Sequence, residues 1–292
     1  MARRARVGAI EIAYETFGVP DDPPLLLIMG LGTQMIGWPD EFCRALESRG
    51  LYVIRFDNRD IGLSTHLHDA PAPNVMAAVA GDTRSASYTL TDMAADAAGL
   101  LDALALTSAH VVGASLGGMV AQTLAIEHPR RVRSLTSMMS TTGDRRVGTP
   151  TQAGAAALMA PPARDRNGAI ERALNSARAI GSPGFPLDEQ AVRDRAARSF
   201  DRAFDPPGVA RQLVAVLCSP DRTPQLHELA VPTLVIHGAD DALIGVSGGR
   251  ATAAAIPGAE LVIIEGMGHD LPRALWPELA GHIGDLIARV ER

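Results

Sequence analysis

Three short segments carry residue types that could together perform nucleophilic catalysis. Ser115 lies in the segment GASLG, Asp241 in GADD and His269 in GMGH. A serine hydroxyl is a poor nucleophile until a base removes its proton, and a histidine serves as that base when a carboxylate orients its ring. The sequence therefore predicts a serine nucleophile, a histidine base and an orienting aspartate that the fold must bring together.

The residues around Ser115 predict a sharp turn from a strand into a helix. The run HVVG precedes the turn, and apolar residues with helical spacing follow it from Met119. Side chains two positions before and after the apex would collide, and Gly113 and Gly117 stand at those positions. Ser115 would then occupy the strained apex with its hydroxyl clear of the sheet. The alternative is a glycine turn with no catalytic role.

Among the eight histidines of the chain, His269 is the best candidate for the base. It follows a predicted strand and precedes the last predicted helix, which puts it at the carboxyl edge of the sheet beside Ser115. His66 and His68 have a loosely metal-like spacing, but the sequence offers no convincing third ligand. We therefore predict no metal site, and the predicted chemistry requires no organic cofactor.

The carboxylate that orients the histidine is expected after the apolar run of residues 231–237. Asp240 and Asp241 both follow this run. Asp241 is preferred because Asp240 is closer to the strand, where its side chain would face or cap the turn. A polar turn without chemical duty, made by these aspartates and His237, is the alternative.

Ester chemistry also needs donors for the negative charge that develops on the carbonyl oxygen. The segment Gly30-Leu31-Gly32 follows the apolar run LLLIM, and a predicted helix begins soon after it. We expect the backbone N–H groups of Leu31 and Leu116 to converge as an oxyanion hole. A glycine turn with no such role is the alternative.

Composition excludes several kinds of chemistry. The 292 residues carry a formal net charge of -6 and contain no lysine, so all 27 basic residues are arginine. Schiff-base catalysis, pyridoxal phosphate attachment and the Walker phosphate loop each need a lysine amine and are excluded. The acidic balance opposes a nucleic-acid partner, so we interpret the arginines at residues 3–6 as a solvated chain end.

Features that would send the chain out of the cytoplasm or into a membrane are missing from the sequence. Cys43 and Cys218 are the two cysteines, which do not make a disulfide framework. No apolar stretch of signal-peptide type follows the basic start, and no run is long enough to span a bilayer. We expect a cytoplasmic protein, and the sequence leaves its oligomeric state open.

The elements that must position these residues alternate between strands and helices. Short apolar runs at residues 25–29, 51–56, 110–113, 132–139, 231–237 and 261–265 are typical of strands buried on both faces. Residues 9–17 alternate apolar and polar side chains, as expected for an antiparallel strand near an edge. Helical spacing appears from Leu90 to Leu104, behind the cap candidate Thr89, and from Leu275 to Val290. This order predicts a doubly wound α/β sheet.

The alternation stops between residues 141 and 229. Helical fragments at residues 169–180 and 188–204 lie there among prolines and glycines. We predict a core domain of residues 1–140 and 230–292 and a helical cap of residues 141–229 over the carboxyl edge of the sheet; a partly disordered loop is the alternative. Four apolar residues are candidates for the substrate pocket or, equally, for ordinary core: Trp38, Met159, Phe185 and Phe200.

Taken together, the motifs resemble those of the α/β-hydrolase superfamily. Within it, MGLG followed by GWPDEF, then RFDNRDIGLST, GASLGGMVAQ, PTLVIHGADD and GMGHDLP are similar to the aclacinomycin methylesterase group of capped serine esterases. The resemblance implies Ser115 as nucleophile, Asp241 as acid, His269 as base and a helical lid. It implies an α/β-hydrolase fold, with a mostly parallel doubly wound sheet and a helical cap inserted after the sixth strand. The DNRDIGLS loop is expected to be mainly structural, with direct substrate contact as the alternative.

The function expected from these residues is hydrolysis of a carboxylic ester through an acyl-enzyme intermediate. The partner would be a small-molecule ester of small to medium size and apolar character. Cofactor-free perhydrolysis of the haloperoxidase type would use the same three residues. A noncatalytic receptor for a small ligand is a further alternative on the same fold.

Overall fold

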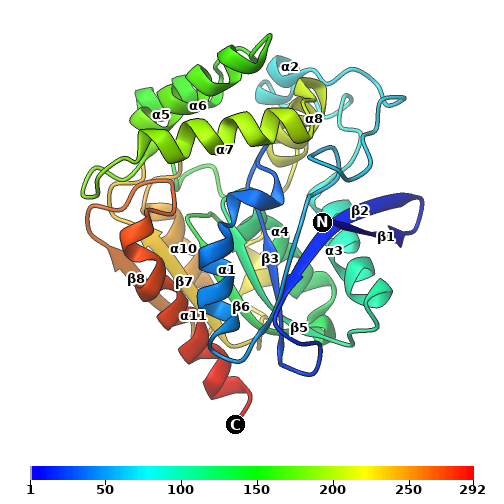
Figure 1. Ribbon diagram of the computed structural model, residues 1–292, viewed down its shortest axis with the longest axis vertical. Helices are drawn as coiled ribbons and strands as arrows, with labels where there is room; N and C mark the ends of the chain where they lie inside the picture. Colours follow the sequence, from blue (N-terminus) through cyan, green and yellow to red (C-terminus); the bar gives the residue numbers. More distant parts are fainter. Residues whose placement is uncertain (1) are drawn as a thin grey trace.

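The computed structural model describes residues 2–292, so Met1 lies outside the described residues. They form one eight-stranded sheet with helices on both faces (Figure 1). The strand order is β1-β2-β4-β3-β5-β6-β7-β8. The strands are β1 (Arg3–Val7), β2 (Ile10–Phe17), β3 (Pro24–Ile28), β4 (Tyr52–Phe56), β5 (Ala109–Ala114), β6 (Val132–Met138), β7 (Thr233–Gly238) and β8 (Glu260–Ile264).

The sheet is parallel from β4 to β8, and β1 and β2 add an antiparallel hairpin at one edge. Strands β3, β4, β5 and β7 are buried at every position, as the continuous apolar runs predicted. The charged side chain of Arg55 in β4 is buried because it pairs with Glu15 and Asp40. The predicted doubly wound α/β sheet is confirmed.

Strand β1 corrects the interpretation of the basic chain end. Arg3, Arg4 and Arg6 are exposed, as expected for a solvated segment, but they belong to a strand that pairs with β2. Ala5 is buried on the other side of this strand, in the core cluster that Val7 also contacts. Backbone pairing to β2 makes the segment a strand although most of its side chains are charged.

Two hydrophobic layers hold the helices on the sheet. Leu26 and Ile28 face the layer that contains α3 and α4, whereas Leu25 and Leu27 face the layer that contains α1 and α11. Thr89 caps α3 in a capping box with Asp92, as its position predicted. The core helices are α1 (Asp40–Glu47), α2 (Val75–Val79), α3 (Leu90–Ala103), α4 (Leu116–Glu127), α10 (Ser247–Ala255) and α11 (Trp276–Val290), with 3-10 turns η1 (Met35–Gly37), η2 (Pro129–Arg131) and η3 (Arg273–Leu275).

The segment between β6 and β7 is helical, in agreement with the two predicted fragments. Figure 1 shows α5, α6 and α7 stacked beyond one end of the sheet, with α8 beside α2. The short helix α9 instead packs on α4 and α10, and Leu226 belongs to the core. The helices of this segment are α5 (Gln152–Leu158), α6 (Arg166–Ile180), α7 (Glu189–Arg202), α8 (Pro206–Leu217) and α9 (Thr223–Leu226).

Two buried carboxylates of the DNRDIGLS loop join the core to this helical segment. Asp57 accepts hydrogen bonds from the N–H groups of Met35 and Leu63, and its carboxylate lies 3.1 Å from Arg202 at the end of α7. Asp60 binds Arg211 of α8 through two hydrogen bonds of 2.8 Å. These contacts support the structural role expected for the loop. Along residues 2–292, no helix combines the length and apolar character needed to cross a membrane.

Candidate active site

Ser115 stands at the point where β5 turns into α4. Its φ is 57° and its ψ is −121°, a left-handed backbone conformation that is strained for any residue other than glycine. The N–H of Ser115 donates to the Met138 carbonyl of the neighbouring strand at 2.9 Å. The carbonyl of Ser115 accepts from the Ser140 hydroxyl at 2.8 Å. The surrounding structure therefore holds the strained turn in place.

The glycines around Ser115 are needed for the reason that the sequence predicted. A Cβ atom on Gly113 would lie 2.0 Å from the Gly117 carbonyl oxygen, and one on Gly117 would lie 2.1 Å from the Ile28 carbonyl oxygen. A Cβ on Gly118 would lie 2.6 Å from the Ser140 Cβ. Since these neighbours are mainly backbone atoms that cannot move aside, β5, α4 and β3 approach one another only without side chains here.

His269 reaches Ser115 from the loop after β8. Its Nε2 atom lies 2.9 Å from the Ser115 Oγ atom, and its Nδ1 atom lies 2.7 Å from the Asp241 Oδ2 atom. Both distances are those of hydrogen bonds, so Ser115, His269 and Asp241 form a continuous hydrogen-bonded series although they lie far apart in the sequence. The backbone N–H of His269 donates to the Ile180 carbonyl at 2.7 Å, which ties the base to the end of α6.

Asp241, not Asp240, contacts the histidine. The Asp241 side chain is buried, and its Oδ1 atom accepts from the N–H groups of Leu243 and Ile244 at 2.9 and 2.8 Å. Burial alone would raise the pKa of Asp241, but hydrogen bonds from His237 and His269 outweigh it and hold that pKa well below its ordinary value. Asp240 is exposed and accepts from the Gly266 N–H at 2.9 Å, which braces the histidine loop.

A second histidine supports the aspartate, and the sequence reasoning did not give it this position. His237 is buried at the end of β7, with its Nε2 atom 2.7 Å from the Ile244 carbonyl and 3.4 Å from the Asp241 Oδ2 atom. A Cβ on Gly249 would lie 2.4 Å from the His237 Nδ1 atom, so α10 packs directly on the ring. The i,i+4 spacing of His237 and Asp241 was the available signal, but it carries no meaning until the turn between them is known.

The loop after β3 lies against the serine. A Cβ on Gly30 would be 3.2 Å from the Ser115 Cβ, and the Met29 carbonyl accepts from the Asn58 amide at 2.9 Å. Within residues 2–292, no acceptor is bound to the backbone N–H of Leu31 or of Leu116. Both predicted oxyanion donors are therefore available beside the serine.

Gln212 of α8 holds this loop in place, a role that the sequence analysis did not predict. It is fully buried, its Oε1 atom accepts from the Gly32 N–H at 3.0 Å, and its amide donates to the Arg59 carbonyl at 3.0 Å. Gly32 and Gln212 are 180 positions apart. A contact of that separation leaves no local pattern in the chain.

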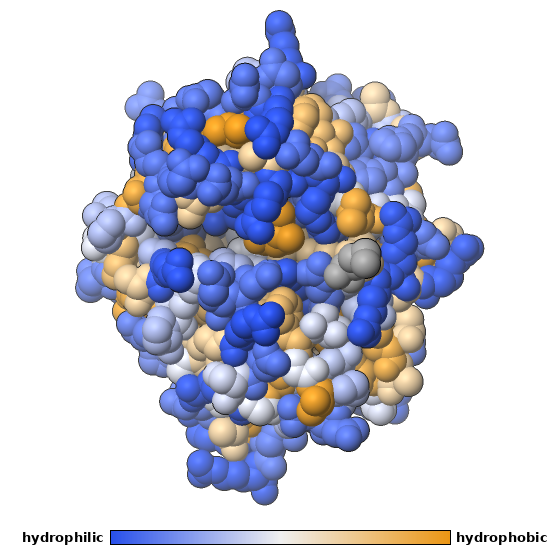
Figure 2. Space-filling view, in the orientation of Figure 1, coloured by the Kyte–Doolittle hydropathy of each residue, from blue (hydrophilic) through white to orange (hydrophobic). Residues whose placement is uncertain are grey.

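A cavity of about 1710 Å³ opens over Ser115 and His269, between the core and helices α5 to α8. Figure 2 shows a mostly hydrophilic surface with apolar side chains gathered near the junction of the upper helices and the core. Three of the four predicted pocket residues line the cavity: Met159, Phe185 and Phe200. Met159 is also exposed, so it lies where the cavity meets solvent.

The placement of Trp38 in the pocket was wrong. Its side chain is fully buried in the core layer under α1, where its ring stacks on Phe42 with centroids 5.7 Å apart. Trp38 directly precedes Pro39, the N-cap of α1, and the apolar face of this helix packs on the sheet. The indole therefore turns inward with that face and away from the cavity.

The loosely metal-like pair of histidines meets a third polar group in the fold. His66, His68 and Asp205 offer ligand atoms within 4.8 Å of one another. The His66 Nδ1 atom lies 2.6 Å from the Asp205 Oδ2 atom, a hydrogen-bond separation that leaves no space for an ion between them. Arg211 lies 3.6 Å from the same carboxylate. The cluster is built as a hydrogen-bonded anchor between the core and α8.

Comparison with known proteins agrees with this fold and geometry. The model of the α/β hydrolase fold family matches residues 23–272. The chain belongs to this family. Its α/β-hydrolase relatives include rhodomycin D methylesterase DauP of Streptomyces sp. (strain C5), which is 33% identical over 290 residues that cover 92% of both chains. The predicted resemblance to methylesterases is confirmed.

Two further α/β-hydrolase comparisons place the chain among varied relatives. "Putative non-heme bromoperoxidase BpoC" of Mycobacterium tuberculosis is 30% identical, covering 89% of this chain and 91% of that protein. Among solved structures, a hydrolase of Pseudomonas aeruginosa PA01 superimposes with a TM-score of 0.70 at 28% identity, covering 99% of this chain and 97% of that chain. The fold is thus shared over nearly the whole length.

Proposed function

We propose that this protein is a serine esterase in which Ser115, His269 and Asp241 form the catalytic triad. One observation carries the proposal: the His269 ring bridges the Ser115 Oγ atom at 2.9 Å and the Asp241 Oδ2 atom at 2.7 Å. A base within hydrogen-bond reach of the nucleophile and held by a third group is the arrangement that activates a serine hydroxyl.

The chain is a carboxylic ester hydrolase. Two relatives over 92% of its length, at 33% and 32% identity, are named rhodomycin D methylesterases. Those relatives are methylesterases by name, and the cavity over Ser115 gives this chain a place for an ester of comparable kind. We propose a small-molecule ester of small to medium size as substrate, since the cavity lies between the cap and the core.

The first half of the reaction forms an acyl-enzyme. The Ser115 Oγ atom attacks the ester carbonyl while its proton passes to the His269 Nε2 atom, and the alcohol leaves with that proton when the tetrahedral intermediate collapses. Asp241 stays ionised throughout and stabilises the imidazolium through the Nδ1 proton, because its pKa is held low by its hydrogen bonds. In the second half, water attacks the acyl carbonyl while His269 removes its proton. The bond to the Ser115 Oγ atom then breaks, the carboxylic acid leaves, and the proton passes from His269 to the serine oxygen.

The negative charge on the carbonyl oxygen needs donors at the moment it develops. The free N–H groups of Leu31 and Leu116 are proposed to supply them, with the positive end of α4 behind Leu116. Loss of one such donor typically raises the barrier by about 2.7 to 4 kcal/mol. Gln212 and Asn58 would keep the Leu31 side of this pocket in place through their bonds to the loop.

A p-nitrophenyl ester panel graded by acyl length, with one bulky methyl ester, tests the proposed function. Wild type should hydrolyse at least one member, and Ser115→Ala should lower kcat by about 10⁵ to 10⁶. Ser48→Ala serves as the matched control because its hydroxyl binds the Ala45 carbonyl at the C-terminal end of α1, and Ser48 does not line the cavity. An alkylphosphonate should attach to Ser115 in a one-to-one ratio. Full turnover in Ser115→Ala would contradict the proposed function.

A second activity has a specific observation in its favour. A relative that is 30% identical carries the name of a non-heme bromoperoxidase. The same triad could let peroxide replace water in the second half-reaction and release a peracid. Acid and peracid formation should be compared on one acetate ester in the presence of peroxide. Labelling of Ser115 without turnover of any ester would instead favour a ligand receptor on this fold.

A further inference from the structure

Arg195 is a charged residue that faces the cavity from α7. Val192, Arg195 and Ser199 are spaced three and four residues apart on this helix, and all three line the cavity. The Arg195 side chain is partly buried. Within residues 2–292, its guanidinium donates no hydrogen bond and joins no ion pair.

Other arginines on α6 and α7 have acidic partners, and two of them, Arg166 and Arg178, also line the cavity. Arg166 pairs with Asp201, Arg178 with Glu189, and Arg193 with Glu171. Arg193 is two positions from Arg195 on α7 and does not line the cavity. Arg172 and Arg198 also line the cavity without an ion pair among the described residues, but both are exposed, whereas Arg195 is partly buried.

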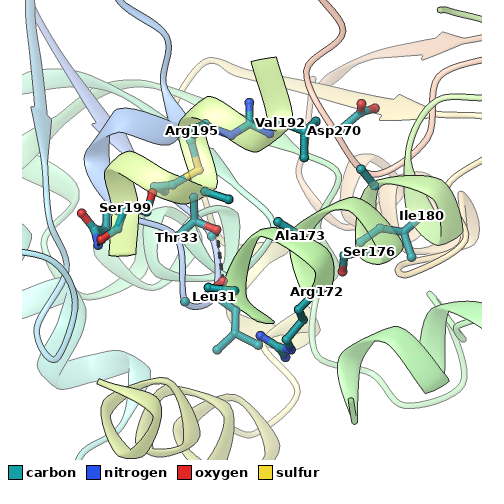
Figure 3. Close-up of a pocket in the computed structure, with 18 of the residues that line it drawn as sticks. Leu31, Thr33, Arg172, Ala173, Ser176, Ile180, Val192, Arg195, Ser199 and Asp270 are labelled. Atoms are coloured by element: carbon teal, nitrogen blue, oxygen red, sulfur yellow. Dashed lines mark hydrogen bonds between the residues drawn. The ribbon is translucent and has the colours of Figure 1, made fainter. Parts of the chain in front are cut away.

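Asp270 is the acidic residue whose charge acts on Arg195, and its carboxylate already accepts a hydrogen bond. Figure 3 shows Arg195 and Asp270 reaching into the cavity from different walls. The Ser182 hydroxyl donates to the Asp270 carboxylate, and no ion pair joins Asp270 to Arg195 among the described residues. Burial lowers the pKa of Arg195, while Asp270 partly opposes this effect. The guanidinium thus loses hydration without gaining a partner in the protein.

We propose that Arg195 is the subsite for a carboxylate of the substrate, so that the preferred esters derive from acids with a second, free carboxyl group. This inference rests on the proposed ester hydrolysis at Ser115. A guanidinium presents parallel N–H donors that match the two oxygens of a carboxylate, and a neutral carbonyl would satisfy it less well. Arg195, Ser115 and His269 line the same cavity, so one substrate can contact all three residues.

A matched pair of esters tests the subsite. Mono-p-nitrophenyl glutarate and p-nitrophenyl pentanoate have acyl chains of the same length and differ in a terminal carboxylate against a methyl group. The quantity measured is the ratio of their kcat/KM values, glutarate over pentanoate. The neutral ester reports on folding and on the triad in every variant, so the ratio isolates the charged contact.

We expect Arg195→Gln to lower this ratio by about 10- to 100-fold, the range for a lost charge-assisted hydrogen bond. Most of the loss should appear in KM, because the contact holds the substrate before and during the reaction. Arg195→Lys should give an intermediate ratio, since it keeps the charge but not the planar fork. Arg193→Gln, the same change on the outer face of α7, should leave the ratio at its wild-type value.

Two outcomes overturn the inference: a ratio that Arg195→Gln leaves unchanged, or an equal drop in Arg193→Gln. Calorimetric titration of free glutarate needs no turnover and separates the two proposals. If no ester is hydrolysed in a Ser115-dependent way, the proposed function fails. The carboxylate subsite still stands if glutarate binds wild type at least ten times more tightly than Arg195→Gln, and falls if it does not.

Discussion

The carboxyl edge of the sheet and the helices that cover it are stabilised in different ways. In α4, which begins at the serine, ten of twelve residues are buried. Helices α6 and α7 face the serine across the cavity. Among their described residues, each has one that is buried, Leu174 in α6 and Val192 in α7. The core thus fixes its side chains by packing, whereas α6 and α7 rely on ion pairs and a few anchors.

This contrast separates two tasks. The serine turn and Asp241 are held by the core, through close backbone contacts and through the N–H groups that bind the aspartate, whereas His269 is also tied to the end of α6. The cavity wall over them comes largely from α6 and α7, most of whose side chains are exposed or partly buried, so substitutions there can alter substrate choice while the core contacts stay in place. Substitutions in each region can show which of them affects catalysis and which affects substrate binding or stability.

The largest effect is expected on the core side, in Asp241→Asn. The change keeps the shape of the side chain but removes the charge that holds the His269 Nδ1 proton, and such a change typically costs about 10⁴ in kcat. Asp240→Asn is the matched control, because Asp240 is exposed and an amide oxygen can still accept from Gly266. Steady-state kinetics on a p-nitrophenyl ester measure both. Similar losses in the two variants would contradict the assignment.

The sequence predicted this part of the site because its signals are local. The glycines at 113 and 117 stand two positions from Ser115, and Asp241 and His269 each follow a strand end that periodicity identifies. The sheet then brings those ends together by topology alone. What the sequence did not reveal depends on the fold: the contact of Gln212 with Gly32, the turn that brings His237 under Asp241, and the cavity that Arg195 lines.

Trp38 and β1 show a second limit of prediction. An aromatic residue at the start of a helix can face a cavity or the core, and the turn before it decides which. A run of arginines reads as a solvated end until a partner strand is known to lie beside it. In both cases the residue types are compatible with two structures, and tertiary pairing selects one.

The next largest effect is expected where the cap joins the core. Arg211→Leu leaves the Asp60 carboxylate buried without its bidentate partner, and breaking a buried pair typically costs about 3 to 5 kcal/mol of unfolding free energy. Urea denaturation measures the loss. Arg166→Gln, which breaks an exposed pair on α6, should cost far less.

The double variant Asp60→Asn, Arg211→Leu provides the check on this interpretation. It removes both charges, so it should recover part of the stability that Arg211→Leu loses. A double variant as unstable as the sum of the two single changes would mean that the pair is not coupled. The cap would then be held by packing, like the core.

A smaller effect is expected where the cap touches the histidine loop. The Ser182 hydroxyl accepts from the Gly268 N–H at 2.8 Å and donates to Asp270, on either side of His269. Ser182→Ala should lower kcat by about five- to thirtyfold with a smaller change in KM, as for loss of one or two hydrogen bonds. Ser219→Ala, whose hydroxyl binds within its own helix end, is the control. A change confined to KM would place Ser182 in substrate binding alone.

The smallest effect is expected in the pH dependence of stability, to which Asp241 and Asp270 should contribute with opposite signs. The pKa of Asp241 is lowered from 3.8 by the hydrogen bonds that outweigh its burial, whereas burial raises the pKa of Asp270 above 3.8. The stability that Asp241 contributes is present above pH 3.8 and is lost as pH falls through its lowered pKa. Asp270 has the opposite sign: its ionisation costs stability at neutral pH, and the cost is relieved as pH falls toward 3.8.

Urea unfolding between pH 7 and pH 3 should therefore give two opposite trends. Relative to Asp241→Asn, wild type should lose stability as the pH falls below 3.8, because the advantage of the ionised carboxylate disappears. Relative to Asp270→Asn, wild type should gain stability over the range above 3.8, because the buried group takes up its proton there. Parallel curves for wild type and both variants would mean that Asp241 in its hydrogen-bond network and Asp270 in the cavity wall are solvated equally, and the two carboxyl groups would then not differ in electrostatics.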